Sequence, residues 1–92
     1  MPRNTIEAYG DIVHALFIGH QEGAFPRSEL MDQFLIELNV LQEETRIAHL
    51  KGMLGLGFII RVNMGNAYKQ ATYKLGPKGL EVAKRLISEK ID

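Results

Sequence analysis

Basic side chains gather in one part of the chain, where they could bind anions such as phosphate groups. Residues 42–78 hold six Lys or Arg against two Glu, a net charge of +4, whereas residues 1–41 hold two Arg against six Asp or Glu, a net charge of −4. The remaining residues balance, so the chain is formally neutral. A basic segment within a neutral chain favours a polyanionic partner at that segment.

The residue types needed for catalysis or metal binding do not occur at a useful spacing. His14, His20 and His49 stand far apart with no carboxylate at ligand spacing, and cysteine is absent. No phosphate-binding glycine loop and no Ser/His/Asp grouping can be assembled. We therefore expect a protein that is not an enzyme and has neither a metal site nor a cofactor.

Length and composition favour a single small domain over residues 1–92. Forty-six per cent of the residues are hydrophobic, which suffices for one modest core. The first residues lack the apolar run of a signal peptide, and no segment reaches the roughly 18 apolar residues of a membrane span. A cytoplasmic protein without a membrane partner is therefore the default expectation.

Hydrophobic periodicity predicts four helices and one hairpin. The helices are expected at about residues 5–19, 26–38, 42–56 and from 77 onward. Strands are expected at residues 58–62 and 68–75, joined by a tip near residues 63–66. Asn4 or Thr5 can cap the first helix, and Gly55 and Gly57 are expected to end the third in the left-handed conformation.

This order of elements predicts an α+β, mostly helical fold with a three-helix core, a two-stranded wing and a C-terminal helix. It resembles the winged helix-turn-helix regulators of the MarR and PadR type, and similar small archaeal and phage-borne regulators, over about residues 25–87. The residues that carry the resemblance are Leu50, Leu54, Gly57, Ile59, Ile60, Arg61, Tyr73, Leu75 and Gly79. Gly76 departs from the pattern, because such proteins usually carry a capping threonine there.

The resemblance implies a sequence-specific transcriptional regulator that binds double-stranded DNA. Residues 42–56 would be the recognition helix in the major groove, and residues 58–75 would be the wing on the DNA backbone. Turning the helix at about 100° per residue predicts an outward face of Gln42, Thr45, Ala48, His49 and Gly52. The residues expected to contact DNA are Arg27, Ser28, Gln42, Thr45, Arg46, His49, Arg61, Asn63, Asn66, Lys69 and Lys74.

Several of these positions also have structural explanations, which the sequence leaves open. Gly52 suits close approach to DNA, and it suits packing against the first helix or the wing equally well. Glu43 and Glu44 would repel phosphate, although acids also stabilise the positive end of a helix dipole. A charged hairpin can also protect an exposed strand edge from pairing with another chain.

The C-terminal helix carries a wider apolar face than one small core needs, which predicts a homodimer. The residues expected at the dimer interface are Ile6, Tyr9, Ala83, Ile87 and Ile91. The main alternative function comes from another class of protein. It is a winged helix that mediates protein–protein interaction within a larger assembly, as the neutral overall charge would permit.

Overall fold

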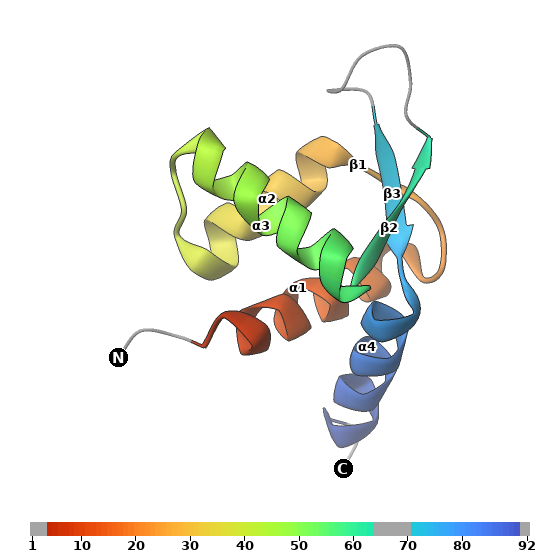
Figure 1. The fold of residues 1–92 in the computed structure, drawn as a ribbon. Coiled ribbons are helices and arrows are strands. Elements are labelled where there is room, and N and C mark those ends of the chain that lie inside the picture. The colour runs from red at the N-terminus through yellow and green to blue at the C-terminus, as the bar shows by residue number, and fades with distance from the viewer. Residues whose placement is uncertain (1–3, 64–70, 91–92) are drawn as a thin grey trace.

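The structure is a computed structural model that describes residues 4–63 and 71–90, and this part of the chain forms four helices and a small three-stranded antiparallel sheet. The helices are α1 (Thr5–His20), α2 (Arg27–Leu38), α3 (Glu43–Leu56) and α4 (Pro77–Lys90). The strands are β1 (Phe25–Pro26), β2 (Ile59–Asn63) and β3 (Thr72–Leu75). Figure 1 shows the first three helices grouped together, with the strands at one side and α4 leading away. The predicted α+β class and the order of the helices are confirmed.

Local chemistry sets the ends of the helices. Asn4 caps α1, because its side-chain oxygen accepts a hydrogen bond from the backbone N–H of Ile6 at 2.8 Å. Asn39 ends α2 with φ 55° and Gly57 ends α3 with φ 83°, both in the left-handed region. The expectation that Gly55 also takes this conformation is wrong, because Gly55 lies inside α3.

The sheet has the strand order β1-β3-β2, and its first strand is a correction to the sequence analysis. Phe25 pairs with Tyr73 and Pro26 with Thr72, where only the start of a helix is predicted. A strand of two residues has no alternation that could reveal it, and proline is tolerated because β1 lies at a sheet edge. The expected tip of the hairpin, near residues 63–66, falls mostly outside the described residues, as does the expected strand between residues 68 and 70.

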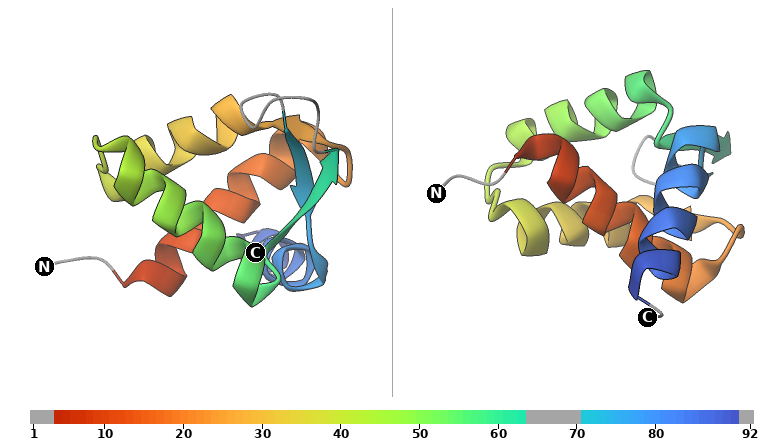
Figure 2. Two further views of the ribbon diagram at one scale, coloured as in Figure 1. Left: turned by 45° about the horizontal axis from the view of Figure 1, so that its top comes forward. Right: turned by 90° about the horizontal axis from the view of Figure 1, so that it is seen from below.

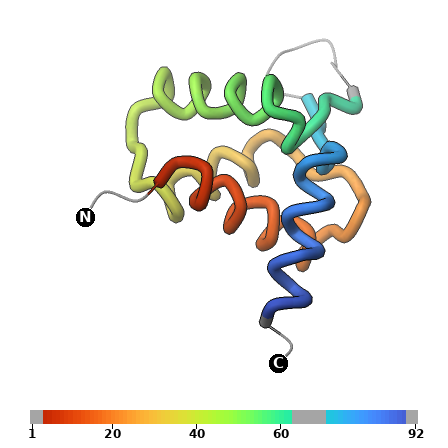
Figure 3. The backbone as a smooth tube through the Cα atoms, turned by 60° about the horizontal axis from the view of Figure 1, so that its bottom comes forward, coloured from red at the N-terminus to blue at the C-terminus, as the bar shows by residue number. Residues whose placement is uncertain are grey.

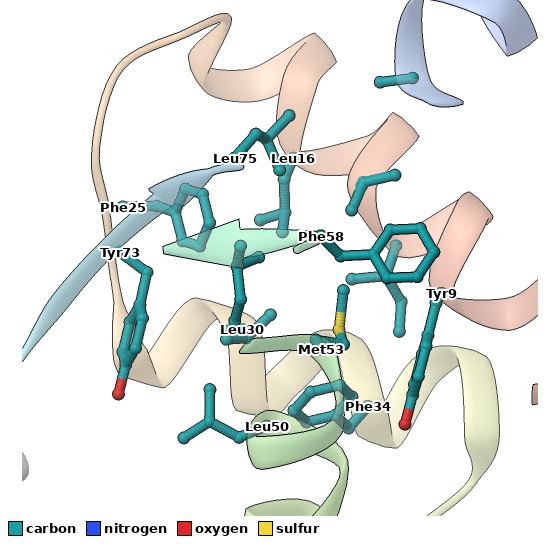
Figure 4. Close-up of a cluster of buried hydrophobic side chains, with 14 of the residues drawn as sticks. Tyr9, Leu16, Phe25, Leu30, Phe34, Leu50, Met53, Phe58, Tyr73 and Leu75 are labelled. Carbon is teal, nitrogen blue, oxygen red and sulfur yellow. The ribbon is translucent and has the colours of Figure 1, made fainter. Parts of the chain in front are cut away.

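The hydrophobic core is formed by side chains from the helices and from the strands. Figure 4 shows the aromatic and aliphatic side chains of α1, α2 and α3 meeting those of the strands. The largest fully buried side chains are Tyr73, Phe25, Phe34, Ile12, Leu16, Leu30, Leu50, Met53, Ile59 and Val13. The inward alternation of Tyr73 and Leu75 on β3 is the one predicted for a half-buried strand.

The start of α4 packs directly onto the backbone where α3 ends. The Gly76 N–H donates to the Phe58 carbonyl at 2.9 Å, and the Lys78 N–H donates to the Gly57 carbonyl at 3.1 Å. A Cβ atom at Gly76 would collide with the Gly57 carbonyl, and one at Gly79 would collide with the Phe58 carbonyl. Glycine therefore replaces the expected threonine at position 76 because the backbones of two elements touch there.

Two residues that are expected at a dimer interface are buried within one subunit instead. Tyr9 and Ala83 both belong to the hydrophobic core, Tyr9 on the part of α1 that packs against α3 and Phe58, and Ala83 on α4, which packs against α1 (Figure 2, right). Their burial is therefore explained without a second subunit. Ile6 is exposed and Ile87 is half-buried, while Ile91 lies outside the described residues.

Candidate nucleic-acid interface

Helix α3 presents one long side to solvent. Residues that recur every three or four positions along it are exposed, and they form what we call the outward face of α3: Glu44, Thr45, Ala48, Lys51 and Gly55. The opposite side packs into the core through Leu50 and Met53. Figures 1 and 2 show α3 packed against the other helices on one side, with no described helix or strand covering its other side. Its side chains are small or polar, with one acid and one base.

This orientation corrects the predicted one. The predicted outward face is centred between Thr45 and Gly52, whereas the observed one is turned toward Glu44 and Lys51. The reason is Met53, which is fully buried, whereas the predicted rotation takes only Ile47, Leu50 and Leu54 as the buried side. Adding Met53 to these residues rotates the buried side toward His49. Lys51 is therefore a candidate contact residue that sequence reasoning missed.

His49 is half-buried and turns toward α1 rather than fully toward solvent. Its Nδ1 lies 2.7 Å from the hydroxyl oxygen of Tyr9, and the two groups share a hydrogen bond. The Tyr9 ring packs edge-on against the imidazole, with centroids 5.7 Å apart, and Phe34 approaches it to 5.8 Å. His49 thus joins α3 to α1 and is withdrawn from the candidate contacts with DNA.

The position of Tyr9 also explains why residue 52 is a glycine. A Cβ atom at Gly52 would come within 3.2 Å of the Tyr9 hydroxyl oxygen, which is tighter than most side-chain contacts. Of the two roles that the sequence leaves open, packing against α1 is the one that the structure supports. Tyr9, His49 and Gly52 together fix how α3 lies on α1, and therefore which of its residues face outward.

We expect replacement of Tyr9 by phenylalanine to lower the free energy of unfolding by about 1 kcal/mol, the net worth of one hydrogen bond. Burial removes water from the Tyr9 hydroxyl and raises its pKa above the ordinary value. The unfolded phenol ionises near pH 10, so the contribution of Tyr9 is complete below about pH 10 and declines as the pH rises through the raised pKa. Urea unfolding of both proteins at several pH values measures it. A difference between them that stays constant above pH 10 would contradict this account.

The two basic residues on the described strands β2 and β3, Arg61 and Lys74, lie on opposite faces of the sheet. Arg61 is directly opposite Tyr73, whose side chain points into the core beneath α2 and α3 (Figure 4). Its guanidinium carbon lies 5.8 Å from the centre of the Tyr73 ring. Lys74 is opposite Ile60, and both side chains point to the other face. Arg61 is therefore on the same side as α3, and Lys74 is not.

The start of α2 contributes one exposed residue and one buried residue. Ser28 is exposed, as a phosphate contact requires. Arg27 is only 7% exposed, and its guanidinium lies 3.7 Å from the Glu43 carboxylate. Arg27 is therefore withdrawn as a phosphate contact. It offsets the charge of Glu43, which leaves Glu44 as the acid that the outward face of α3 presents.

The other predicted contact residues are placed as follows. Gln42 is exposed and immediately precedes α3, where it takes the N-cap position without a side-chain hydrogen bond. Arg46 is half-buried on the flank of α3. Asn63 ends β2 opposite Thr72. Asn66 and Lys69 lie outside the described residues.

Other kinds of site find little support in the described part of the chain. No three His, Asp or Glu side chains among the described residues are grouped so that they could hold a metal ion. His20 instead pairs with Glu29, with 2.5 Å between Nε2 and Oε2, and joins the end of α1 to the start of α2. None of the described helices combines the length and the apolar composition needed to cross a membrane.

Comparison with known proteins identifies no relative. Neither the family models nor the curated proteins nor the solved structures include a match to this chain. The candidate interface therefore stands on its own geometry: the outward face of α3, with Arg61 on the same side and Ser28 at the neighbouring helix start.

Proposed function

We propose that this protein is a winged-helix regulator of transcription that binds double-stranded DNA sequence-specifically. In this proposal α3 enters the major groove and the β2–β3 hairpin is the wing that contacts the DNA backbone. The observation that carries it is the uncovered outward face of α3, with small and polar side chains and with Arg61 on the same side. Such a regulator would act in the cytoplasm.

The size of the outward face supports insertion into a groove. The major groove is about 12 Å wide and accepts one helix if its leading face is slim. Ala48 and Gly55 lie in the middle and at the end of this face, so the α3 backbone could come close to the bases. Lys51 could then reach a phosphate or a guanine, and Thr45 a thymine methyl group or a phosphate.

The two acidic residues at the start of α3 are the main feature that disfavours DNA binding by this helix. Glu43 is balanced by Arg27, whereas Glu44 is exposed on the outward face and would repel phosphate. Glu44 also lies in the first helical turn, where a negative charge stabilises the helix. Carboxylates can accept a hydrogen bond from the amino group of cytosine, so Glu44 is compatible with a role in reading bases.

We also propose that the protein acts as a homodimer. A single module of this size contacts only a few base pairs, which limits both affinity and specificity. Two copies related by a two-fold axis would present two α3 helices to inverted half-sites about one helical turn apart.

Replacing Thr45 with alanine should relax the sequence preference at one or two base pairs while the protein stays folded. The loss is expected to be about 1 to 3 kcal/mol for the preferred site, because one base contact disappears, with little change for random DNA. Competition binding to the preferred duplex and to single-base variants measures it. Equal weakening on preferred and random DNA would show that Thr45 does not read bases.

The competing candidate is a winged helix that binds another protein. It is favoured by the exposed apolar side chains at the end of α3 and along β2, which are Leu56, Ile60 and Val62. Apolar side chains at such a place are typical of protein interfaces rather than of phosphate contacts.

Fluorescence anisotropy of a labelled random duplex at low salt separates the two candidates. A DNA-binding protein should bind the duplex, lose affinity steeply as salt rises, and select a preferred sequence from a random library. Failure to bind duplex DNA even at low salt would reject the DNA proposal and favour the interaction module.

A further inference from the structure

The hydroxyl group of Tyr73 is buried without a hydrogen bond. Tyr73 is fully buried, and its hydroxyl oxygen has no hydrogen-bond partner among the described residues. Nε of Arg46, on the flank of α3, is a second buried atom in the same condition. Taking a polar group out of water costs free energy unless a new partner replaces the water, and one such partner is a bound ion.

These two residues belong to one junction between α2, α3 and the sheet. In Figure 4 the Tyr73 side chain points toward the part of α3 that carries Leu50. Arg46 precedes Leu50 by one helical turn, so it lies on the same side of α3. Glu43, one turn before Arg46, lies 3.7 Å from the guanidinium of Arg27 at the start of α2. This start of α2 lies beside β3, which carries Tyr73 (Figure 3).

The junction is rich in arginine. Arg61 on β2 lies over the ring of Tyr73, with its guanidinium carbon 5.8 Å from the ring centre. Together with Arg27 and Arg46 it places three positive charges around the junction, whereas Glu43 supplies one negative charge. Guanidinium and hydroxyl groups donate hydrogen bonds, and arginine binds phosphate oxygens especially well. The junction is therefore suited to an anion.

We propose that this junction binds a phosphate group, with the hydroxyl of Tyr73 and the guanidinium of Arg46 as its hydrogen-bond donors. The Tyr73 hydroxyl is covered, so the phosphate must displace part of the cover. Arg61 is exposed and has a long flexible side chain, so it can move aside and then pair with the phosphate. The phosphate group can be free or part of a DNA backbone. The site does not require that α3 enter a DNA groove.

Inorganic phosphate is the probe for this site. Backbone amide NMR at constant ionic strength, with chloride as the reference anion, measures its binding. The wild type should show saturable shifts at Arg46, Arg61 and Tyr73. Tyr73→Phe removes the hydroxyl but keeps the ring, and Arg46→Gln removes the guanidinium. Each should raise the dissociation constant for phosphate by at least roughly 10-fold, because one hydrogen bond to a charged group is lost.

Tyr9→Phe and Lys84→Gln are the matched controls. Tyr9→Phe removes a hydroxyl that is bound to His49, outside the junction. Lys84→Gln removes an exposed positive charge from α4, which leads away from the other helices (Figure 1). Both should bind phosphate like the wild type. Wild-type protein that does not bind phosphate in preference to chloride would overturn the proposal, and so would a folded Tyr73→Phe variant with unchanged phosphate affinity.

A labelled DNA duplex distinguishes the two sources of the phosphate group. If the site holds a phosphate of the DNA backbone, inorganic phosphate should compete with the duplex at constant ionic strength, and Tyr73→Phe should weaken duplex binding as well. If the site holds free phosphate only, duplex binding should be the same with and without added phosphate. Both results support the site and identify its ligand. A wild-type protein that binds phosphate but no duplex would reject the DNA function and leave the site in place.

Discussion

Replacing Gly79 with alanine is expected to lower the free energy of unfolding by about 3 kcal/mol, a large share of the stability of a small domain. The added methyl group would overlap the carbonyl oxygen of Phe58. This oxygen belongs to the backbone and accepts the Gly76 N–H, so it cannot move away as a flexible side chain could. The start of α4 must therefore separate from the end of α3.

Gly55→Ala is the matched control for this prediction. Gly55 is an exposed residue inside α3, and nothing lies within 4 Å of the place where its Cβ would be. Alanine favours the helix by up to about 1 kcal/mol over glycine, so this variant should be slightly more stable than the wild type. Urea unfolding followed by circular dichroism measures both. A similar loss in the two variants would show that the contact with Phe58 is unimportant.

Removing Lys51 and Arg61, two exposed basic side chains on the α3 side of the protein, should weaken DNA binding while the protein stays folded. In Lys51→Ala with Arg61→Ala, each lost phosphate contact removes one charge-assisted hydrogen bond. Each such bond is worth about 1.5 to 3 kcal/mol, so we expect the dissociation constant for any duplex to rise roughly 100-fold or more. The slope of log affinity against log salt should fall by about one unit for each contact.

Lys74→Ala provides the control for the double variant. Lys74 carries the same charge on the same hairpin as Arg61, but it points to the opposite face of the sheet. We therefore expect its removal to leave the affinity and the salt slope nearly unchanged. If Lys74→Ala weakens binding as much as the double variant does, then charge alone matters and the assigned face is wrong.

The helices could be predicted from sequence because each repeats its apolar residues over several turns. Helix ends are also marked by Asn4, Gly57 and Pro77, because these residue types are favoured at the ends of helices. The strand β1 could not be predicted, since Phe25 and Pro26 become a strand only by pairing with β3, far along the chain. Pairing between distant segments leaves no local periodic pattern.

The candidate site was harder to predict than the fold. A small error in the rotation of α3 exchanges His49 for Lys51. The correct rotation depends on the burial of Met53, and His49 then meets Tyr9, forty residues away in the sequence. Arginine is a residue type that often binds phosphate, but the side chain of Arg27 is buried. Its backbone N–H donates to the Ala71 carbonyl at 3.3 Å, which holds the start of α2 beside β3. Residue type alone does not tell a buried arginine from an exposed one.

Backbone amide NMR of the wild-type protein, titrated with duplex DNA at low salt, tests most directly the claim that α3 and the hairpin form a DNA-binding face. We predict the largest shifts at Thr45, Ala48 and Lys51 on the outward face of α3 and at Arg61 on β2, with small shifts along α4. A titration without shifts, or with shifts confined to α4, would contradict the account.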